Sequence, residues 1–200
     1  MSILCQNFEM GFIITMKTIT TPLDKVEARS LRCGDAILLT GVIFTARDAA
    51  HGRMMESIKQ GIPLPFHIEN AIVYYVGPTP PKPGSAIGSA GPTTSGRMDA
   101  FTPALIALGL TGMIGKGTRC TEVVSAMHEH GAVYFGAVGG AGALLARCIK
   151  TSEVVAYEDL GTEAICKLTV KDMPLIVVID CEGNDLYKKG RIDYLQRNNI

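Results

Sequence analysis

Short runs of aliphatic and β-branched residues recur along the chain, and each run is ended by glycine, proline or charged residues. Runs of this length and composition predict β-strands separated by turns. The longest, residues 36–44 (AILLTGVIF), is apolar almost throughout, which is typical of a strand buried on both faces. Pro174 is expected to confine the last turn. The predicted strands are residues 17–23, 36–44, 71–76, 111–114, 132–135, 153–156, 165–170 and 175–180.

The stretches between the strands contain signals for helix starts and stops. Thr45 can cap a helix that runs to about Gln60, and Thr102 precedes Pro103, which is typical of an N-cap followed by proline at the first helical position. Strands interleaved with short helices predict an α/β fold, although their spacing is too irregular to indicate a doubly wound sheet. The predicted helices are residues 45–60, 102–108, 122–130 and 143–148, with a short turn or helix at 24–31.

A length of 200 residues suits a single domain. Residues 1–15 are expected to be an N-terminal extension without a role in the core, since Met16 could be an alternative start. They lack the basic segment of a signal peptide, and no run reaches about 18 apolar residues without glycine or charge. We therefore expect one domain over residues 16–200, located in the cytoplasm.

Charge and cysteine content narrow the range of functions. Lysine and arginine number 19, as do aspartate and glutamate, so no net charge favours nucleic acid or an anionic membrane as partner. A small molecule or a protein is the more natural partner. The six cysteines show no C-x-x-C or other metal-binding spacing, so we expect no zinc or iron–sulfur site in this chain. Without a secretion signal, reduced thiols are expected.

Residues 91–99, GPTTSGRMD, have the composition of a loop that binds a ligand. The glycines permit close approach of the backbone, and the hydroxyls can donate to an anion or cap the following helix. Arg97 offers a planar fork of donors suited to a carboxylate or phosphate. A well-capped turn with a solvated arginine explains the same residues, and both interpretations stay open on this stretch alone.

Arg47 comes directly after the predicted strand at 36–44, at the carboxyl end where open α/β sheets bind ligands. A salt bridge to Asp48 or Glu56 is the structural alternative.

Two glycine-rich stretches resemble nucleotide-binding loops without matching their spacing. Lys116 lies between two glycines, but the G-x-x-x-x-G-K-[ST] pattern is absent. Residues 136–142, GAVGGAG, have the wrong register for a dinucleotide loop, and tight packing of a helix on a sheet explains them better.

The motifs from Arg47 onward together resemble the beta subunit, or C-terminal domain, of the iron–sulfur hydro-lyases, the family of class I fumarase and L-tartrate dehydratase. The resemblance covers about residues 17–190. It implies a compact three-layer β/β/α domain of the swivelling type with mixed sheets. It also implies a separate alpha subunit that holds a four-iron four-sulfur cluster, with no metal or cofactor bound by this chain. The motifs, in family order, are TARDAAH at 45–51, GPTTSGRMD at 91–99, GKG at 115–117, YFGAVGG at 134–140, GTEAI at 161–165 and DCEGND at 180–185.

The resemblance further implies a dicarboxylate site built from three motifs. Arg47, Arg97 and Lys116 would grip the carboxylates and stabilise the charge that develops when the adjacent carbon loses its proton, so that Lys116 also acts in catalysis. Thr93 would transfer that proton, since clustered cations can favour a deprotonated hydroxyl. The residues expected to orient these groups or complete the subunit contact are Asp48, His51 and Asp99. For His51, a plain helix-surface or core role is equally open.

The implied function is that of a hydro-lyase beta subunit, active only with its alpha subunit. Fumarate hydratase, which interconverts fumarate and L-malate, is the first expectation. L(+)-tartrate dehydratase shares the carboxylate grip, and nothing in this chain separates the two substrates. A non-catalytic anion-binding or assembly module that uses the same three cations is the alternative from another class. A hetero-oligomer is expected, with self-association of the isolated chain as a second outcome.

Overall fold

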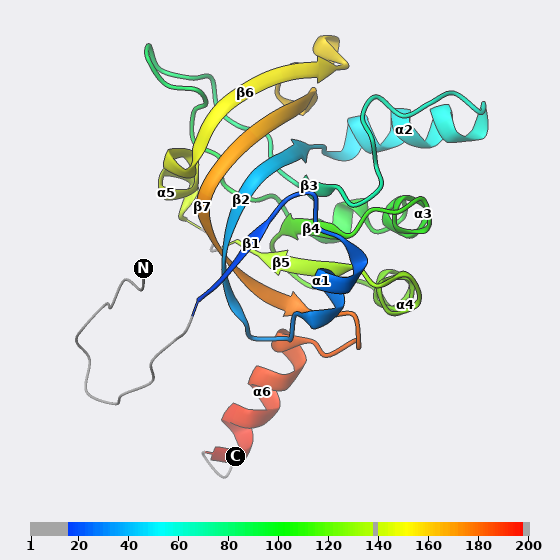
Figure 1. Ribbon diagram of the computed structural model, residues 1–200, viewed down its shortest axis with the longest axis vertical. Coiled ribbons are helices and arrows are strands. Elements are labelled where there is room, and N and C mark those ends of the chain that lie inside the picture. Colours follow the sequence, from blue (N-terminus) through cyan, green and yellow to red (C-terminus); the bar gives the residue numbers. More distant parts are fainter. Residues whose placement is uncertain (1–15, 138–139, 198–200) are drawn as a thin grey trace.

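The structure, a computed structural model, describes residues 16–137 and 140–197 (Figure 1). Residues 1–15, the predicted extension, lie outside the described residues. The strands are β1 (Lys17–Thr20), β2 (Ala36–Thr45), β3 (Ile72–Tyr74), β4 (Gly112–Gly115), β5 (Val133–Gly136), β6 (Ile149–Ala156) and β7 (Ile165–Ile179). The α-helices are α1 (Lys25–Ser30), α2 (Asp48–Lys59), α3 (Thr102–Ala107), α4 (Thr121–His130), α5 (Gly142–Cys148) and α6 (Leu186–Arg197), and two short 3-10 helices are η1 (Ser95–Met98) and η2 (Glu158–Glu163).

The described strands form one sheet in the order β1-β2-β3-β4-β5-β7-β6, and β2 also pairs with β7. This additional pairing closes β2, β3, β4, β5 and β7 into a ring, which β1 and β6 extend on the outside. Strands β1 to β5 pair in parallel, whereas β7 runs antiparallel to β2, β5 and β6. The carboxyl ends of β2, β3, β4 and β5 therefore lie at one edge.

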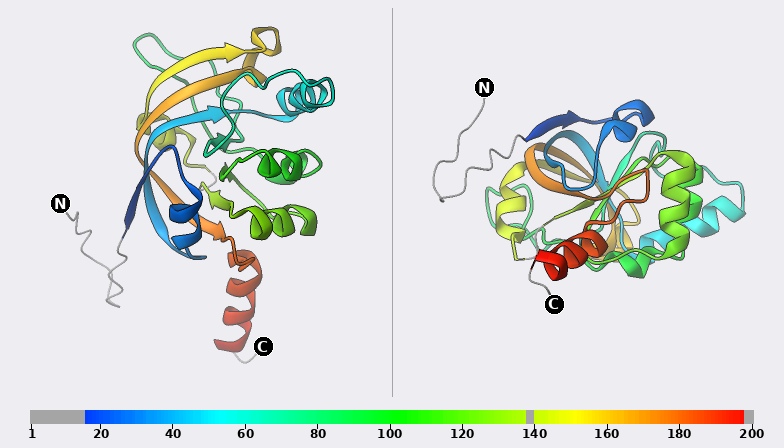
Figure 2. Two further views of the ribbon diagram at one scale, coloured as in Figure 1. Left: turned by 45° about the vertical axis from the view of Figure 1, so that its right-hand side comes forward. Right: turned by 90° about the horizontal axis from the view of Figure 1, so that it is seen from below.

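Three layers build the domain, and a hydrophobic core fills each of the two spaces between them (Figures 1 and 2). Strands β1, β2, β6 and β7 form a curved outer layer, β3, β4 and β5 lie in the middle, and α2, α3 and α4 cover the other side. Alternate residues of the middle strands serve the two cores, since Tyr74 and Phe135 belong to the first and Tyr75 and Tyr134 to the second. The predicted three-layer β/β/α domain is confirmed.

Local signals position several helices, although the predicted N-cap residue Thr102 is the first residue of its helix and Phe101 precedes it as the N-cap. Asp24 caps α1 by accepting a hydrogen bond from the Glu27 N–H at 2.8 Å. Helix α3 begins at Thr102 itself, with Pro103 in its first turn. Gly109 follows that helix with φ 107°, a conformation that suits glycine and ends the helix.

The start of α2 differs from the prediction. Thr45 is the last residue of β2 and not the cap of α2. Its buried hydroxyl donates to the Ala164 carbonyl oxygen (3.2 Å) and accepts from the Cys166 N–H (2.9 Å). Arg47 occupies the N-cap position instead, with extended backbone and no side-chain bond to the helix. The prediction was wrong because a threonine hydroxyl can satisfy a neighbouring strand as well as a helix end.

Strand β7 is one strand of 15 residues where the sequence predicted two. Pro174 lies within it, opposite Leu38 of β2. Proline is tolerated in a strand where its missing N–H is not needed by a neighbour. β6 pairs with residues 165–170 and β5 with residues 176–179, so Pro174 falls between their ladders.

The expectation that β2 is buried on both faces was also wrong, because one of its faces is largely buried while the other is half-buried.

The sequence did not predict α6. Its residues, LYKKGRIDYLQR, mix a few apolar side chains with many charged ones and show no continuous hydrophobic face. Figure 1 shows α6 projecting beyond the end of β7, away from the other helices. None of the helices that the structure describes is long and apolar enough to cross a membrane.

Candidate functional site

The predicted cations follow the carboxyl ends of neighbouring strands. Arg47 comes just after β2 and Lys116 directly after β4, while β3 between them leads on to Gly77. Because these strands are parallel, the segments that leave them lie at the same edge of the sheet. Residues far apart in the sequence are thereby brought to one place.

The loop that carries Thr93 lies across this edge. A short bridge pairs Thr94 with Lys116. The Thr93 N–H donates to the Tyr75 carbonyl oxygen (2.8 Å), and the Lys116 N–H donates to the Thr93 carbonyl oxygen (3.3 Å). Thr93 is therefore fixed between the ends of β3 and β4, beside Lys116.

Asp48 joins the two predicted arginines. Its Oδ1 accepts a hydrogen bond from Nε of Arg97 at 2.8 Å, and its Oδ2 lies 3.8 Å from Nη2 of Arg47. The same Nη2 lies 3.3 Å from Oε1 of Glu163. The Arg47–Asp48 salt bridge that the sequence offered as an alternative does exist, but it is a loose one shared with Arg97. Arg47 and Arg97 are thus neighbours through a common carboxylate.

The three cations differ in exposure. The Arg47 side chain is 20% exposed, whereas that of Arg97 is 48% exposed and Lys116 is also exposed. Arg47 lies over Gly77, where an added Cβ would clash with Nη1 and lie 3.1 Å from Cδ of the arginine. Arg47 is therefore the inner cation, and Arg97 and Lys116 are the outer ones.

Several groups at this edge keep unused hydrogen-bonding capacity. Arg97 uses Nε for Asp48, and its two Nη atoms have no partner among the described residues. Within the same part of the chain, the Lys116 ammonium pairs with no carboxylate and the Thr93 hydroxyl makes no hydrogen bond. Three cations and two carboxylates leave one net positive charge. These donors suit an anionic ligand with more than one acceptor group.

His51 lies in the core behind Arg47. Its Nδ1 is 2.8 Å from the Arg47 carbonyl oxygen, and its ring contacts Tyr75 and Phe101. Burial, aided by the charge of Arg119 and partly opposed by the hydrogen bond to Arg47, lowers the pKa of His51 to about 4, so the ring is neutral near pH 7. A neutral ring protonated at Nδ1 donates to the Arg47 main chain. The core role and the supporting role left open by the sequence are therefore compatible.

Asp99 contacts the start of α4. Its Oδ1 accepts from Nε of Arg119 (2.7 Å), and its Oδ2 accepts from the Cys120 N–H (2.7 Å). The Arg119 side chain is fully buried, with its guanidinium about 5 Å from the ring centres of Tyr75 and Tyr134. A buried arginine requires a paired carboxylate. Asp99 therefore fixes the turn after Arg97 to α4 and supports the site from a distance.

Two residues at this edge were not singled out from the sequence. Glu163 is the nearest carboxylate to Arg47. Its place in the GTEAI motif was the one feature of the sequence that could have pointed to it. Ser95 is buried, with Oγ 2.8 Å from the Tyr134 hydroxyl, which also donates to the Gly117 carbonyl oxygen (3.0 Å). Burial raises the pKa of Tyr134, so this phenol stays protonated and holds the Lys116 loop.

No three histidine, cysteine, aspartate or glutamate side chains in residues 16–137 and 140–197 are grouped as metal ligands would be. The thiols in this part of the chain do not converge and so do not fit an iron–sulfur cluster. That a partner chain carries such a cluster stays a prediction. The free cysteines are Cys33, Cys120, Cys148, Cys166 and Cys181.

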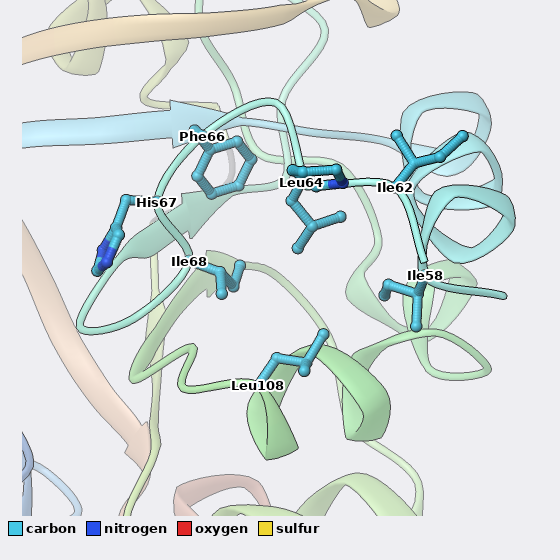
Figure 3. Close-up of a pocket in the computed structure, with 8 residues that line it drawn as sticks. Ile58, Ile62, Leu64, Phe66, His67, Ile68 and Leu108 are labelled. Carbon is cyan, nitrogen blue, oxygen red and sulfur yellow. The ribbon is translucent and has the colours of Figure 1, made fainter. Parts of the chain in front are cut away.

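A separate apolar hollow of about 610 Å³ lies at the other end of α2 (Figure 3). Apart from His67, its lining is aliphatic, proline or aromatic, so it does not suit a dicarboxylate. Its lining residues include Ile58, Ile62, Leu64, Phe66, Ile68 and Leu108.

Residues 12–190 match the family model described as Fumarase C-terminus. The chain belongs to this family. Among relatives of this Fumarase C-terminus protein, the anaerobic class I fumarate hydratase of Escherichia coli K12 is 43% identical over 153 residues, which are 76% of this chain and 28% of that protein. Fumarate hydratase 2 of Leishmania major is 38% identical over 172 residues, 84% of this chain and 30% of that protein.

A shorter relative is a Methanocaldococcus jannaschii protein provisionally named L(+)-tartrate dehydratase subunit beta. It is 37% identical over 173 residues, which are 84% of this chain and 89% of that protein. The Fumarase C-terminus chain thus spans less than a third of these two fumarate hydratases and most of this subunit. The family resemblance inferred from the motifs is confirmed.

Proposed function

We propose that this chain is the beta subunit of a hydro-lyase that interconverts fumarate and L-malate, working with a second polypeptide. Two observations carry the proposal: Arg47 and Arg97 share the carboxylate of Asp48, and the main chains of Thr93 and Lys116 are bonded at the same edge of the sheet. Adding water to a double bond between two carboxylates requires that both carboxylates are held and that one carbon receives a proton. The family and the names of the fumarate hydratases support the same reaction.

In this proposal the cations hold the dicarboxylate. The free Nη atoms of Arg97 bind one carboxylate through two parallel hydrogen bonds. Lys116 contributes a point charge at the other side of Thr93, and Arg47 supplies the inner charge. Because Arg47 and Arg97 both face Asp48, their guanidinium groups lie near each other before the substrate arrives.

Thr93 is proposed to move the proton. In the dehydration direction its oxygen, in the deprotonated form, takes the proton from the carbon next to a carboxylate. In the hydration direction its hydroxyl returns that proton. Lys116, whose main chain bonds to Thr93, stabilises the alkoxide and the negative charge that develops on the neighbouring carboxylate.

We further propose that the partner polypeptide holds the four-iron four-sulfur cluster, since no three of the described thiols of this chain are grouped as its ligands would be. The free thiols also support a cytoplasmic location.

L(+)-tartrate dehydratase is the second candidate function. It is supported by the Methanocaldococcus jannaschii relative, which matches this chain over 89% of its own length. Tartrate carries one more hydroxyl than malate, so the same carboxylate grip serves both substrates.

The test is reconstitution. We expect this chain to hydrate fumarate when it is mixed anaerobically with its cluster-bearing partner. The reaction is measured by the loss of fumarate absorbance. Neither polypeptide should be active alone. The Thr93→Ala variant should assemble normally and bind the unreactive dicarboxylate succinate, yet lose turnover by at least about a hundredfold. Thr94→Ala is the matched control, since Thr94 is the exposed neighbour in the same loop, and should stay active.

Activity on tartrate alone would favour the second candidate. No partner-dependent activity on either diacid would favour a non-catalytic anion-binding module, and a fully active Thr93→Ala variant would remove Thr93 from the proton transfer.

A further inference from the structure

We propose that Glu163 is a positioning residue that holds the Arg47 guanidinium in its substrate-binding direction. The proposal rests on the function proposed above and adds a residue from a different segment of the chain. Oε1 of Glu163 lies 3.3 Å from Nη2 of Arg47, while Oε2 accepts a hydrogen bond from the Ala49 N–H at 3.0 Å. One carboxylate thus joins the arginine to the first turn of α2.

The position of Arg47 explains why such a carboxylate is needed. Arg47 is the N-cap of α2, where serine, threonine, aspartate or asparagine normally accepts a hydrogen bond from a free helix N–H. Arginine has no acceptor, and its charge is repelled by the positive end of the helix dipole. Glu163 supplies both missing functions from η2, because it accepts the Ala49 N–H and offsets the charge.

The two carboxylates at this edge contact different arginines most closely. Asp48 gives its strong hydrogen bond to Arg97 and lies 3.8 Å from Arg47, whereas Glu163 is the closer partner of Arg47. Nε of Arg47 is buried without a partner among the described residues, so that end of the guanidinium is not fixed by a hydrogen bond. Glu163 is therefore the main restraint on how Arg47 turns.

The η2 segment has other attachments to the same region. Arg53 of α2 forms a two-pronged ion pair with Asp159 and lies over the Tyr157 ring. The Thr45 hydroxyl donates to the Ala164 carbonyl oxygen. These contacts attach η2 to α2 and β2 at places other than Glu163, and the Asp159 variant below tests whether a change in them alone affects activity.

The Glu163→Gln variant keeps an oxygen that can accept the Ala49 N–H but loses the charge facing Arg47. We expect kcat for fumarate hydration to fall about 10- to 100-fold, because a misdirected guanidinium no longer aligns the substrate. KM for the dianion should not rise, since removal of a negative charge makes the site more positive.

Asp159→Asn is the matched control. It removes another η2 carboxylate that pairs with another α2 arginine, but at an exposed position without contact to Arg47. Its kcat should stay within about twofold of the parent, as surface ion pairs contribute little. In an Arg47→Lys background, Glu163→Gln should cause little further loss, because a residue that acts through Arg47 has nothing left to position.

A readout independent of activity is the exchange of the Arg47 Nε–H with solvent, followed by nitrogen-15 NMR of arginine side chains. We expect exchange at least about tenfold faster in Glu163→Gln and unchanged in Asp159→Asn.

Equal behaviour of the two variants, multiplicative losses in the double variant or unchanged Nε–H exchange would each overturn the positioning role. If the parent pair is inactive on both diacids, the proposed function fails, and the exchange measurement alone then decides the role of Glu163.

Discussion

At the scale of single residues, Gly77 is the position on which the placement of Arg47 most directly depends. The atoms nearest to an added Cβ belong to the flexible end of the Arg47 side chain and not to backbone. A methyl group there can therefore be accommodated by the fold, but only if the guanidinium moves. The glycine thus gives a way to disturb Arg47 without replacing it.

We expect Gly77→Ala to change the free energy of unfolding by less than about 1 kcal/mol while lowering kcat/KM for fumarate at least about tenfold. Urea unfolding and the reconstituted assay measure the two quantities. Gly52→Ala is the control, since an added Cβ in α2 meets open space. It should stabilise the chain by about 0.5–1 kcal/mol and leave activity unchanged. Equal activities of the two variants would contradict the assigned place of Arg47.

The sequence was enough to indicate Arg47 directly after an apolar strand and, through the family resemblance, Thr93 in a glycine-rich loop; their roles in a site stay predictions. The sequence could not predict Glu163 as the partner of Arg47. The pairing depends on how η2 folds back onto α2, and no local pattern states which distant carboxylate a cation will meet. The same holds for the Arg119–Asp99 pair, where burial of the arginine is decided by the surrounding rings.

At the scale of elements, Thr45 lies where four of them meet. It ends β2, precedes α2, and bonds through its hydroxyl to both sides of the junction where η2 becomes β7. Short apolar runs were sufficient to predict most strands and helices. They failed where tertiary pairing overruled a local signal, as at Pro174 within β7, and where a charged helix, α6, offered no apolar face.

Thr45→Val keeps the shape of the side chain but leaves the Cys166 N–H and the Ala164 carbonyl oxygen without this partner. We expect a loss of about 1–3 kcal/mol in the free energy of unfolding, measured with urea. Thr151→Val is the control, because the Thr151 hydroxyl of β6 donates to the Thr169 hydroxyl of β7 at an exposed position. Its effect should stay within about 0.5 kcal/mol. Similar effects of the two changes would argue against Thr45 as the link.

At the scale of the whole molecule, the layers place a titratable group inside the fold. His51 on α2 is fully buried against Tyr75 of the middle layer, close to the buried Arg119. In the unfolded chain its pKa returns to an ordinary value near 6.5, whereas in the folded chain it is about 4. Between these values the unfolded state binds more protons, so lowering the pH through this window destabilises the fold.

We expect the free energy of unfolding to fall by about 2 kcal/mol between pH 7 and pH 5 through His51 alone, at about 1.4 kcal/mol per pH unit below 6.5. Below about pH 4 this contribution becomes constant. Urea unfolding of the parent and of His51→Gln, which keeps an amide donor but does not titrate, should show a shallower pH dependence in the variant. Parallel curves would mean that another group is responsible.

The pairing of β2 with β7 has a consequence for biosynthesis. Residues 36–44 find this neighbour only after residues 167–176 have been made. At translation speeds of roughly 5–20 residues per second, that edge of the nascent polypeptide stays open for on the order of ten seconds. An unpaired edge of this kind can recruit strands from other chains. The yield of native protein should therefore depend on how densely ribosomes and unfinished copies are crowded while it is being made.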